Sequence, residues 1–223
     1  MELAKHIEHT NLKPDCTKEE IIQLCNDAIT HGFYGVCIPP YFVQLAKKTI
    51  GKKAIKVITV VGFPLGYSTV GAKVEDAKKA IISGADEIDM VMNIAAFKSN
   101  DMQTVQNDIQ SVVTVCHLQN KKVKVIIETA YLTDEEIIRA CKVCADCVVD
   151  FVKTSTGYAS LGAEPRTVKL MRAHLPSKIK IKAAGGIKTI KQALELLLAG
   201  ADVLGCSSSL KIISENNENN ENN

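Results

Sequence analysis

Residues 122–157, KVKVIIETAYLTDEEIIRACKVCADCVVDFVKTSTG, decide the fold class of this chain. Short strands are expected over Val123–Thr129 and Cys147–Thr154, because both segments are largely apolar and rich in β-branched residues. Between them, Thr133-x-x-Glu136 has the pattern of a capping box that opens a helix. A strand, a helix and a second strand in this order are typical of a parallel sheet that is covered on both faces.

The same alternation of strand and helix continues in both directions. Thr17-x-x-Glu20 is a second capping box, and the helical patterns Val74–Ser83 and Ile190–Ala199 are each followed by a glycine that suits a helix C-cap. Eight strands with a helix after each predict an α/β fold, a single (β/α)8 TIM barrel. A doubly wound open sheet is the alternative, because periodicity alone does not separate the two. The eight expected strands are His6–Thr10, Gly35–Ile38, Lys56–Gly62, Glu87–Asn93, Val123–Thr129, Cys147–Thr154, Lys178–Ala183 and Asp202–Cys206.

The chain is expected to form one domain over residues 1–214. No linker and no shift in composition divides this part of the sequence. Residues 215–223 are a repeat of Glu and Asn without apolar side chains, and a short disordered C-terminal tail is predicted there.

The composition is that of an ordinary globular protein. Of 223 residues, 46% are hydrophobic and 23% are charged, and the formal net charge is +2. No nucleic-acid partner is expected, because a general nucleic-acid surface needs a strong basic excess. No apolar run approaches the roughly 18 residues that cross a bilayer, and the N-terminus lacks the apolar core of a signal peptide. A cytoplasmic protein without a membrane partner is therefore predicted.

Eight cysteines are present, and they are expected to be reduced because the chain shows no signal peptide. Cys141, Cys144 and Cys147 form C-x2-C-x2-C, a spacing that holds zinc or an iron–sulfur cluster when a fourth ligand is available. The alternative places Cys141 and Cys144 on the buried face of a helix and Cys147 at the start of the next strand. No Cys-Pro or His pair follows, so no metal is expected at this cluster. No cofactor of another kind is expected either.

Two lysines are candidates for the chemistry, which in a parallel barrel lies at the carboxyl ends of the strands. Lys153 follows an apolar strand, and an amine there forms a Schiff base with a carbonyl substrate if enough of it is neutral. Lys182 lies on the next strand, and a like charge beside Lys153 would lower the pKa of one amine. The alternatives are a Lys153 that reaches solvent or a carboxylate, and a solvated basic face shared by Lys178, Lys180 and Lys182.

Asp89 stands in the middle of the expected strand Glu87–Asn93. A carboxylate at such a position needs a cation, which the two lysines would supply. It could also transfer protons, directly or through water. The alternative is an ion pair with a purely structural role.

Three glycine clusters follow late strands, namely Thr156-Gly157, Gly185-Gly186 and Gly205-Cys206-Ser207. Glycine lets backbone N–H groups approach an anion, and barrels often bind phosphate in the loops after the seventh and eighth strands. Together with the lysines, these clusters predict amine catalysis on a phosphorylated carbonyl compound.

A series of motifs resembles the deoxyribose-phosphate aldolase family over residues 7–213. The resemblance implies a (β/α)8 barrel and a metal-independent class I aldolase. The implied reaction is the reversible cleavage of 2-deoxy-D-ribose 5-phosphate to D-glyceraldehyde 3-phosphate and acetaldehyde. The motifs are IEHTNLKP (7–14), VCIPP (36–40), VGFPLG (61–66), EIDMV (87–91), VIIET (125–129), FVKTSTG (151–157) and IKAAGG (181–186).

The same resemblance implies roles for individual residues. Lys153 matches the Schiff-base lysine, Lys182 the lysine that perturbs it, and Asp89 the acid of the proton relay. Family members are commonly dimers or larger, so the resemblance also implies a homodimer or a higher homo-oligomer. Contacts to the substrate or its phosphate are implied for Gly157, Gly185, Gly186, Gly205, Ser207, Thr156, Thr10 and Cys37, the last near the acetaldehyde pocket.

Two features depart from the family pattern. Glu8 stands where many members have Asp, and its longer side chain is expected to change contacts at a substrate hydroxyl. Some members end in a tail whose terminal Tyr reaches the active site, whereas this chain ends in Asn223 with no Tyr near the end.

Two other functions are compatible with the predicted barrel. A phosphosugar isomerase or epimerase would use Asp89 and Glu128 as acid and base, without a covalent intermediate. A non-catalytic phosphosugar-binding barrel would bind the ligand and cleave nothing.

Overall fold

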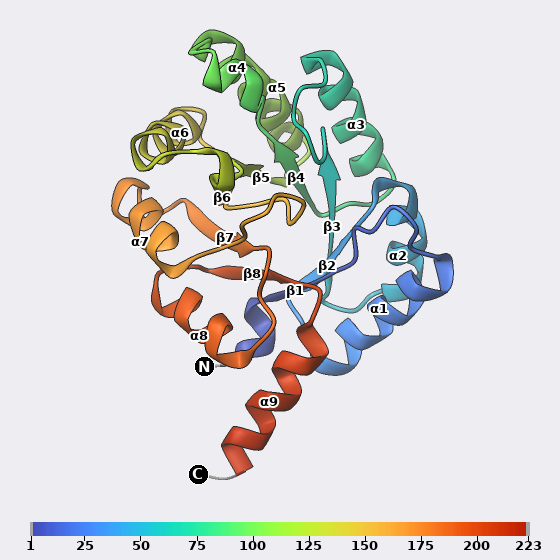
Figure 1. Cartoon of the computed structure of the whole chain (residues 1–223). Coiled ribbons are helices and arrows are strands. Elements are labelled where there is room, and N and C mark those ends of the chain that lie inside the picture. The colour runs from blue at the N-terminus through green and yellow to red at the C-terminus, as the bar shows by residue number, and fades with distance from the viewer. Residues whose placement is uncertain (1, 222–223) are drawn as a thin grey trace.

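Eight parallel strands close into one barrel in the computed structural model, which describes residues 2–221 (Figure 1). Each strand pairs with the next one along the chain, and β8 pairs with β1. The predicted (β/α)8 barrel is therefore confirmed, and the open sheet is wrong. The strands are β1 (Ile7–Thr10), β2 (Gly35–Ile38), β3 (Lys56–Val61), β4 (Glu87–Val91), β5 (Lys122–Ile126), β6 (Phe151–Lys153), β7 (Lys180–Ala184) and β8 (Val203–Cys206).

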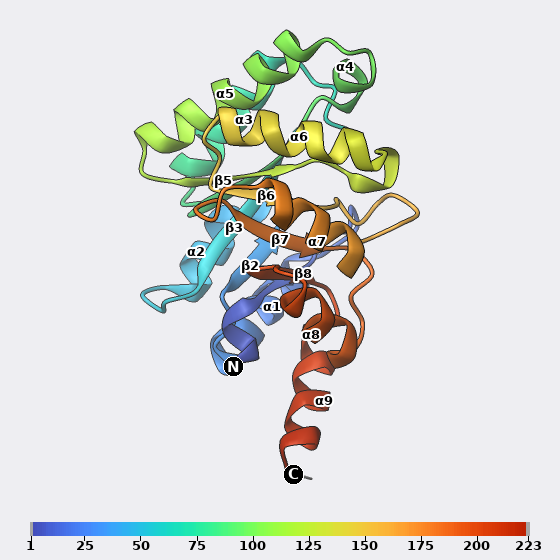
Figure 2. The ribbon, with the colours of Figure 1, turned by 90° about the vertical axis from the view of Figure 1, so that its left-hand side faces the viewer.

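Helices surround the barrel, with α3 and α5 on the opposite side from α8 (Figures 1 and 2). Both predicted capping boxes are present, at Thr17 before α1 and at Thr133 before α6. Within residues 2–221, no helix is both long enough and apolar enough to cross a bilayer. The helices are η1 (Leu3–His6), α1 (Lys18–His31), η2 (Pro40–Phe42), α2 (Val43–Ile50), α3 (Val70–Ile82), α4 (Ile94–Lys98), α5 (Met102–Leu118), η3 (Thr129–Tyr131), α6 (Asp134–Asp146), α7 (Pro165–His174), α8 (Ile190–Leu198) and α9 (Ser209–Glu221), where η marks a 3-10 helix.

The sixth strand begins later than the sequence predicts. The Cys147 N–H donates to the Val143 carbonyl, so Cys147 caps helix α6 and does not open the strand. Val148 then takes a left-handed backbone conformation with φ of 55°, and the strand starts only at Phe151. The apolar pattern does not reveal this turn, because a buried helix end and a buried strand have similar compositions.

Charged side chains fill part of the barrel interior, while the main apolar core lies between the strands and the helices. Glu8, Asp89 and Lys182 come from β1, β4 and β7, which are not neighbours in the sheet. Their contacts, described below, therefore cross the inside of the barrel. A smaller apolar cluster of Cys37, Ile58 and Val60, with Leu12 and Phe63 against it, lies on the β2–β3 side.

A buried ion pair outside the barrel, between α3 and α5, holds the carboxyl end of β4 in place. The fully buried Lys73 of α3 donates to the Val91 carbonyl at 2.8 Å and to Asp108 Oδ2 of α5 at 2.6 Å. The same Asp108 oxygen accepts from the Asn93 N–H at 3.1 Å. Burial lowers the pKa of Lys73 and raises that of Asp108, because it favours the neutral form of each group. The pair ties two helices to the strand that carries Asp89.

The Lys73→Met variant tests this pair. It is expected to lower the free energy of unfolding by about 3–5 kcal/mol, because Asp108 stays buried without its cation. Chemical denaturation followed by circular dichroism measures the change. Lys78→Met, which removes an exposed lysine of the same helix, is the matched control and should change the value by less than about 1 kcal/mol. Equal losses in the two variants would contradict a special role for the buried pair.

Helix α9 replaces part of the tail that the sequence predicts to be disordered. It spans Ser209–Glu221 and projects away from the barrel (Figure 2), so residues 215–221 are helical in the structure. Two contacts of Glu215 stabilise this helix. Its Oε2 accepts a hydrogen bond from the Ile190 N–H of α8 at 2.8 Å, and its Oε1 lies 3.7 Å from Lys211 Nζ. The composition of a segment does not predict a contact with another helix. Residues 222 and 223, the rest of the predicted tail, lie outside the described residues.

Candidate active site

The structure brings Lys153, Lys182 and Asp89 together inside the barrel. Lys153 ends β6 and lies opposite Lys182 of β7 in the sheet register, while Asp89 comes from β4. Lys153 Nζ lies 2.9 Å from Asp89 Oδ2, and Lys182 Nζ lies 2.7 Å from the same oxygen. Two amines from neighbouring strands therefore share one carboxylate oxygen.

The Asp89 carboxylate is fully buried among ammonium groups. Burial by itself raises the pKa of a carboxyl group, because it disfavours the charged form. The charges of Lys124, Lys153 and Lys182 outweigh burial and hold the pKa of Asp89 well below its usual range. Asp89 is thus the anion on which these lysines converge.

Lys182 keeps its proton in this setting. Burial alone would lower the pKa of this amine, but the negative charges around it, Asp89 first and Glu8 among them, raise the pKa above its ordinary value. Glu8 Oε2 also accepts a hydrogen bond from Lys182 Nζ. The sequence hypothesis paired the two lysines with Asp89 and expected their like charges to lower the pKa of one amine, whereas the structure adds a second carboxylate, Glu8 of β1.

Lys124 of β5 is a central site residue that sequence reasoning missed, as it missed Glu87 of β4. Its Nζ lies 3.0 Å from Asp89 Oδ1, 2.6 Å from Glu87 Oε2 and 3.3 Å from Glu8 Oε1. Burial favours the neutral amine, but Asp89, Glu8 and Glu87 raise the pKa of Lys124 well above its ordinary value. The signal in the sequence was the alternation of Lys and Val in this strand. In the structure, Lys124 lies directly opposite Asp89 in the sheet register. The network balances three ammonium groups, Lys124, Lys153 and Lys182, with three carboxylates, Glu8, Glu87 and Asp89.

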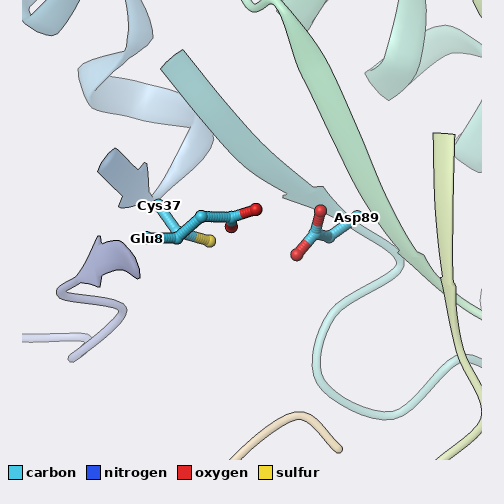
Figure 3. Close-up of side chains that lie close together, drawn as sticks. All are labelled: Glu8, Cys37 and Asp89. Carbon is cyan, nitrogen blue, oxygen red and sulfur yellow. The ribbon is translucent and has the colours of Figure 1, made fainter. Parts of the chain in front are cut away.

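Figure 3 shows Glu8, Cys37 and Asp89, whose carboxylate and thiol groups point toward one another. One ligand atom of each lies within 4.8 Å of the others, as around a metal ion. Lys124 and Lys182 already contact both carboxylates, and burial raises the pKa of the Cys37 thiol. A metal ion would have to displace both ammonium groups, so the protein's own cations occupy the place that a metal would take.

A cavity of about 660 Å³ opens at the carboxyl ends of the strands, and Lys153 is one of the residues that line it. The loops that follow β1, β6, β7 and β8 form much of its wall. Cys37 is instead completely buried, beside Glu8 and Asp89. The other binding candidates all line the cavity: Thr10, Thr156, Gly157, Gly185, Gly186, Gly205 and Ser207.

Two of these glycines are required by the geometry of the wall. Gly185 has a φ of 89°, which an L side chain rarely adopts, and a Cβ there would lie 3.1 Å from Gly162 Cα. A Cβ on Gly205 would lie 3.0 Å from Lys182 Cε. Gly205 therefore leaves the space through which the Lys182 side chain reaches Asp89.

Glu128 holds the backbone of the cavity wall. Its two carboxylate oxygens accept from the Thr156 N–H at 3.3 and 3.2 Å, and Oε2 also accepts from the Thr156 hydroxyl. Glu128 itself takes a left-handed backbone conformation with φ of 51°. The carboxylate that the isomerase hypothesis needs is therefore engaged in shaping the Thr156-Gly157 turn.

The three thiols of the C-x2-C-x2-C pattern are buried and unbridged. Burial raises the pKa of Cys141 to about 12 and that of Cys147 to about 11, and it raises the pKa of Cys144 well above its ordinary value. Among the described residues, the three sulfur atoms are not a group of ligand atoms that lie within 4.8 Å of one another, so the geometry disfavours the metal interpretation. Cys141 and Cys144 lie on the buried face of α6, as the alternative interpretation states.

The family model for the DeoC/LacD family aldolases matches residues 4–215 of the chain. The chain belongs to this family of aldolases. Among its curated relatives, the deoxyribose-phosphate aldolase of Thermococcus gammatolerans is 51% identical over 215 residues, which are 96% of this chain and 96% of that protein.

Two solved structures show how closely the barrel of the family is shared. The structure named "QR15, an Aldolase" superposes with a TM-score of 0.93 at 36% identity, covering 98% of this chain and 97% of that chain. The deoxyribose phosphate aldolase of Aeropyrum pernix, described as a unique tetramer, gives a TM-score of 0.90 at 29% identity, covering 96% of this chain and 91% of that one. As a member of the family, the chain is an aldolase, a lyase that acts on carbon–carbon bonds.

The acid unfolding of the Lys124→Met variant tests the buried network. Since the folded pKa of Asp89 is depressed, Asp89 stabilises the fold above its unfolded pKa of about 3.9, and this stability is lost as the pH falls toward the folded pKa. Removing Lys124 raises the folded pKa, so acid unfolding is expected to shift to higher pH and stability at pH 7 to fall by about 3–5 kcal/mol. Circular dichroism along an acid titration measures the shift.

Lys122→Met is the matched control for that variant. Lys122 is an exposed residue of the same strand, and like Lys124 it lies over the Phe151 ring, at 5.9 Å, but it contacts none of the three carboxylates. Its acid transition should stay at the wild-type pH. An unshifted transition in Lys124→Met as well would contradict the coupling between Lys124 and Asp89.

Proposed function

We propose that this chain is a deoxyribose-phosphate aldolase, which reversibly cleaves 2-deoxy-D-ribose 5-phosphate to D-glyceraldehyde 3-phosphate and acetaldehyde. The main support is the Lys153 amine, which borders the cavity and shares an oxygen of Asp89 with Lys182. The relatives from Thermococcus gammatolerans and Thermococcus kodakarensis, each 51% identical to this chain, carry that name and support the same substrate.

In the first stage of the proposed reaction, neutral Lys153 attacks the aldehyde carbon C1 of the open-chain sugar. The proton that Lys153 must lose passes by way of Asp89 Oδ2, 2.9 Å from its Nζ, to water, because a carboxyl group of depressed pKa does not retain it. Lys182 stays charged, since its pKa is raised, and it can donate a proton to the carbinolamine hydroxyl. That hydroxyl leaves as water, and an iminium forms between C1 and Lys153. Lys182, whose pKa is raised, then recovers a proton from water, so Lys182 and Asp89 both carry their starting charges before the next stage.

In the second stage the C2–C3 bond breaks. Its electron pair moves toward the iminium and leaves an enamine on Lys153, while the C3 hydroxyl gives its proton to Asp89 through water and becomes the aldehyde of glyceraldehyde 3-phosphate. The proton then returns to C2, and water adds to the iminium to release acetaldehyde and the free amine. Side chains and water account for every bond and proton, so the proposal includes no cofactor.

The phosphate is proposed to bind on the wall that carries Gly157, Gly185, Gly186, Gly205 and Ser207. These residues line the same cavity as Lys153, and their backbone N–H groups are suited to an anion. The phosphate is remote from the C2–C3 bond, so its binding energy would position C1 against the amine.

The two alternative functions have less support from the site. An isomerase would need Glu128 as an acid or base, but its carboxylate is engaged by Thr156. A non-catalytic barrel would have no use for a network of buried lysines and carboxylates beside its cavity, because taking charges out of water costs free energy even when they are paired.

Reductive trapping tests the covalent intermediate. Incubation with acetaldehyde and sodium borohydride is expected to attach an ethyl group to Lys153, because the reagent reduces the imine to a stable secondary amine. Mass spectrometry of the peptides locates the adduct. Lys153→Ala should gain no adduct there and should lose turnover by at least about 10⁴-fold, as loss of a covalent nucleophile does elsewhere.

Lys180 supplies the internal control for the trapping reaction. It lies on the neighbouring strand β7 and is exposed, so it reports non-specific alkylation of lysines. Labelling of Lys180 and Lys153 at equal rates, or substantial turnover by Lys153→Ala, would refute the covalent role.

We infer that the chain also assembles into a homo-oligomer. The relative from Aeropyrum pernix is described as a tetramer, and several large apolar side chains of this chain are exposed. Sedimentation equilibrium should give a mass of at least two chains, and a monomer at micromolar concentration would contradict this inference. A cytoplasmic location stays a prediction.

A further inference from the structure

One cation on the wall of the cavity is not used by the proposed reaction. Lys13 and Lys153 are the lysines among the described residues that line the cavity, and no arginine is among them. Lys153 is bound to Asp89, whereas within residues 2–221 the Lys13 ammonium has neither a hydrogen bond nor an ion pair. Lys13 is exposed, so this positive charge stands at the open side of the cavity.

The two carboxylates on the same wall form no ion pair with Lys13, and each contacts other groups instead. Glu20 Oε2 accepts from the Thr17 N–H at 2.7 Å in the capping box. Asp27 Oδ1 accepts from Gln23 Nε2 at 2.8 Å, and its Oδ2 lies 3.8 Å from the Nε2 of His9. The charge of Lys13 is therefore available to an anion that enters the cavity.

The loop that carries Lys13 is fixed beside the glycine wall. The Tyr158 hydroxyl donates to the Leu12 carbonyl at 2.7 Å, directly before Lys13, and Tyr158 itself follows Gly157. The Tyr158 ring packs edge-on against Phe63 with the ring centroids 5.4 Å apart. Within the loop itself, the Lys13 N–H donates to Asn11 Oδ1 at 3.2 Å, which fixes the backbone locally. These contacts join the β1–α1 loop to the turn that borders the proposed phosphate position.

We propose that Lys13 is the side chain that recognises the phosphate of the substrate, and that Tyr158 positions it. This inference rests on the proposed function, which supplies a phosphorylated substrate for the cavity. The glycine loops offer backbone dipoles but no full charge, whereas a sugar phosphate brings close to two negative charges. Lys13 supplies a mobile, strongly hydrated cation that can follow the phosphate into the cavity and pair with it there.

The test compares 2-deoxy-D-ribose 5-phosphate with 2-deoxy-D-ribose, which lacks only the phosphate. Lys13→Gln is expected to lower kcat/KM for the phosphorylated sugar by about 10- to 100-fold, the range for losing a hydrogen bond between charged groups. Most of the loss should lie in KM, and kcat/KM for the unphosphorylated sugar should not change. Lys13→Arg should retain most of the wild-type preference, because it keeps the charge.

Two further variants complete the experiment. Lys53→Gln removes an exposed lysine between α2 and β3, away from the cavity, and it makes the same change in net charge, so its kinetics should match the wild type. Tyr158→Phe keeps the ring against Phe63 but loses the bond to the Leu12 carbonyl. It should lower kcat/KM for the phosphorylated sugar by about 3- to 10-fold, the range for a single neutral hydrogen bond, and leave the unphosphorylated sugar unaffected.

The outcomes separate this inference from the proposed function. Equal losses for both sugars in Lys13→Gln, or no loss for either, would overturn the role of Lys13, and an unchanged preference in Tyr158→Phe would overturn its positioning role. If the wild type cleaves neither sugar, the proposed function fails. Calorimetric titration with inorganic phosphate then still decides the role of Lys13, because Lys13→Gln must bind it at least about 10-fold more weakly than Lys53→Gln does.

Discussion

The shared oxygen of Asp89 is the interaction on which the rest of the site depends. A carboxylate that is buried in a barrel cannot stay ionised without nearby cations. Lys153 and Lys182 bind one of its oxygens and Lys124 binds the other. Because the lysines are buried too, they need counter-charges beyond Asp89, which Glu8 supplies. The network is stable only as a whole, since each buried charge would be costly alone.

The closed barrel makes this network of charges possible, and it keeps the network apart from the apolar core that stabilises the fold. Glu8, Asp89 and Lys182 belong to strands that are not neighbours, so an open sheet would not bring them together. The apolar core lies outside the strands, beneath the helices, where burial of hydrocarbon stabilises the fold. Lys73 and Asp108 connect the two regions, because they hold the end of the strand that carries Asp89.

Two sides of the barrel differ in chemistry, and this difference suits a substrate with two different ends. Apolar side chains on the β2–β3 side include Ile58, Val60 and Phe63, while the loops after β6, β7 and β8 expose glycine backbone. An aldehyde carbon belongs at the amine, and an anion belongs at the backbone N–H groups. Lys13 adds the full positive charge that this second side otherwise lacks, and Tyr158 joins its loop to the glycine wall.

The sequence by itself determined the alternation of strands and helices and the capping boxes, together with the strand positions of Lys153, Lys182 and Asp89, whereas closure of the sheet into a barrel was decided by the structure. These features depend on local periodicity and on the chemistry of single residues, which a sequence displays directly. Only the tertiary structure decided that Lys124 completes the network, that Cys147 ends a helix, and that residues 215–221 are helical. It also decided the direction of the Lys182 pKa, because a pKa depends on distances through space. Glu8 and Lys182 are 174 positions apart in the chain, and no local pattern records that they touch.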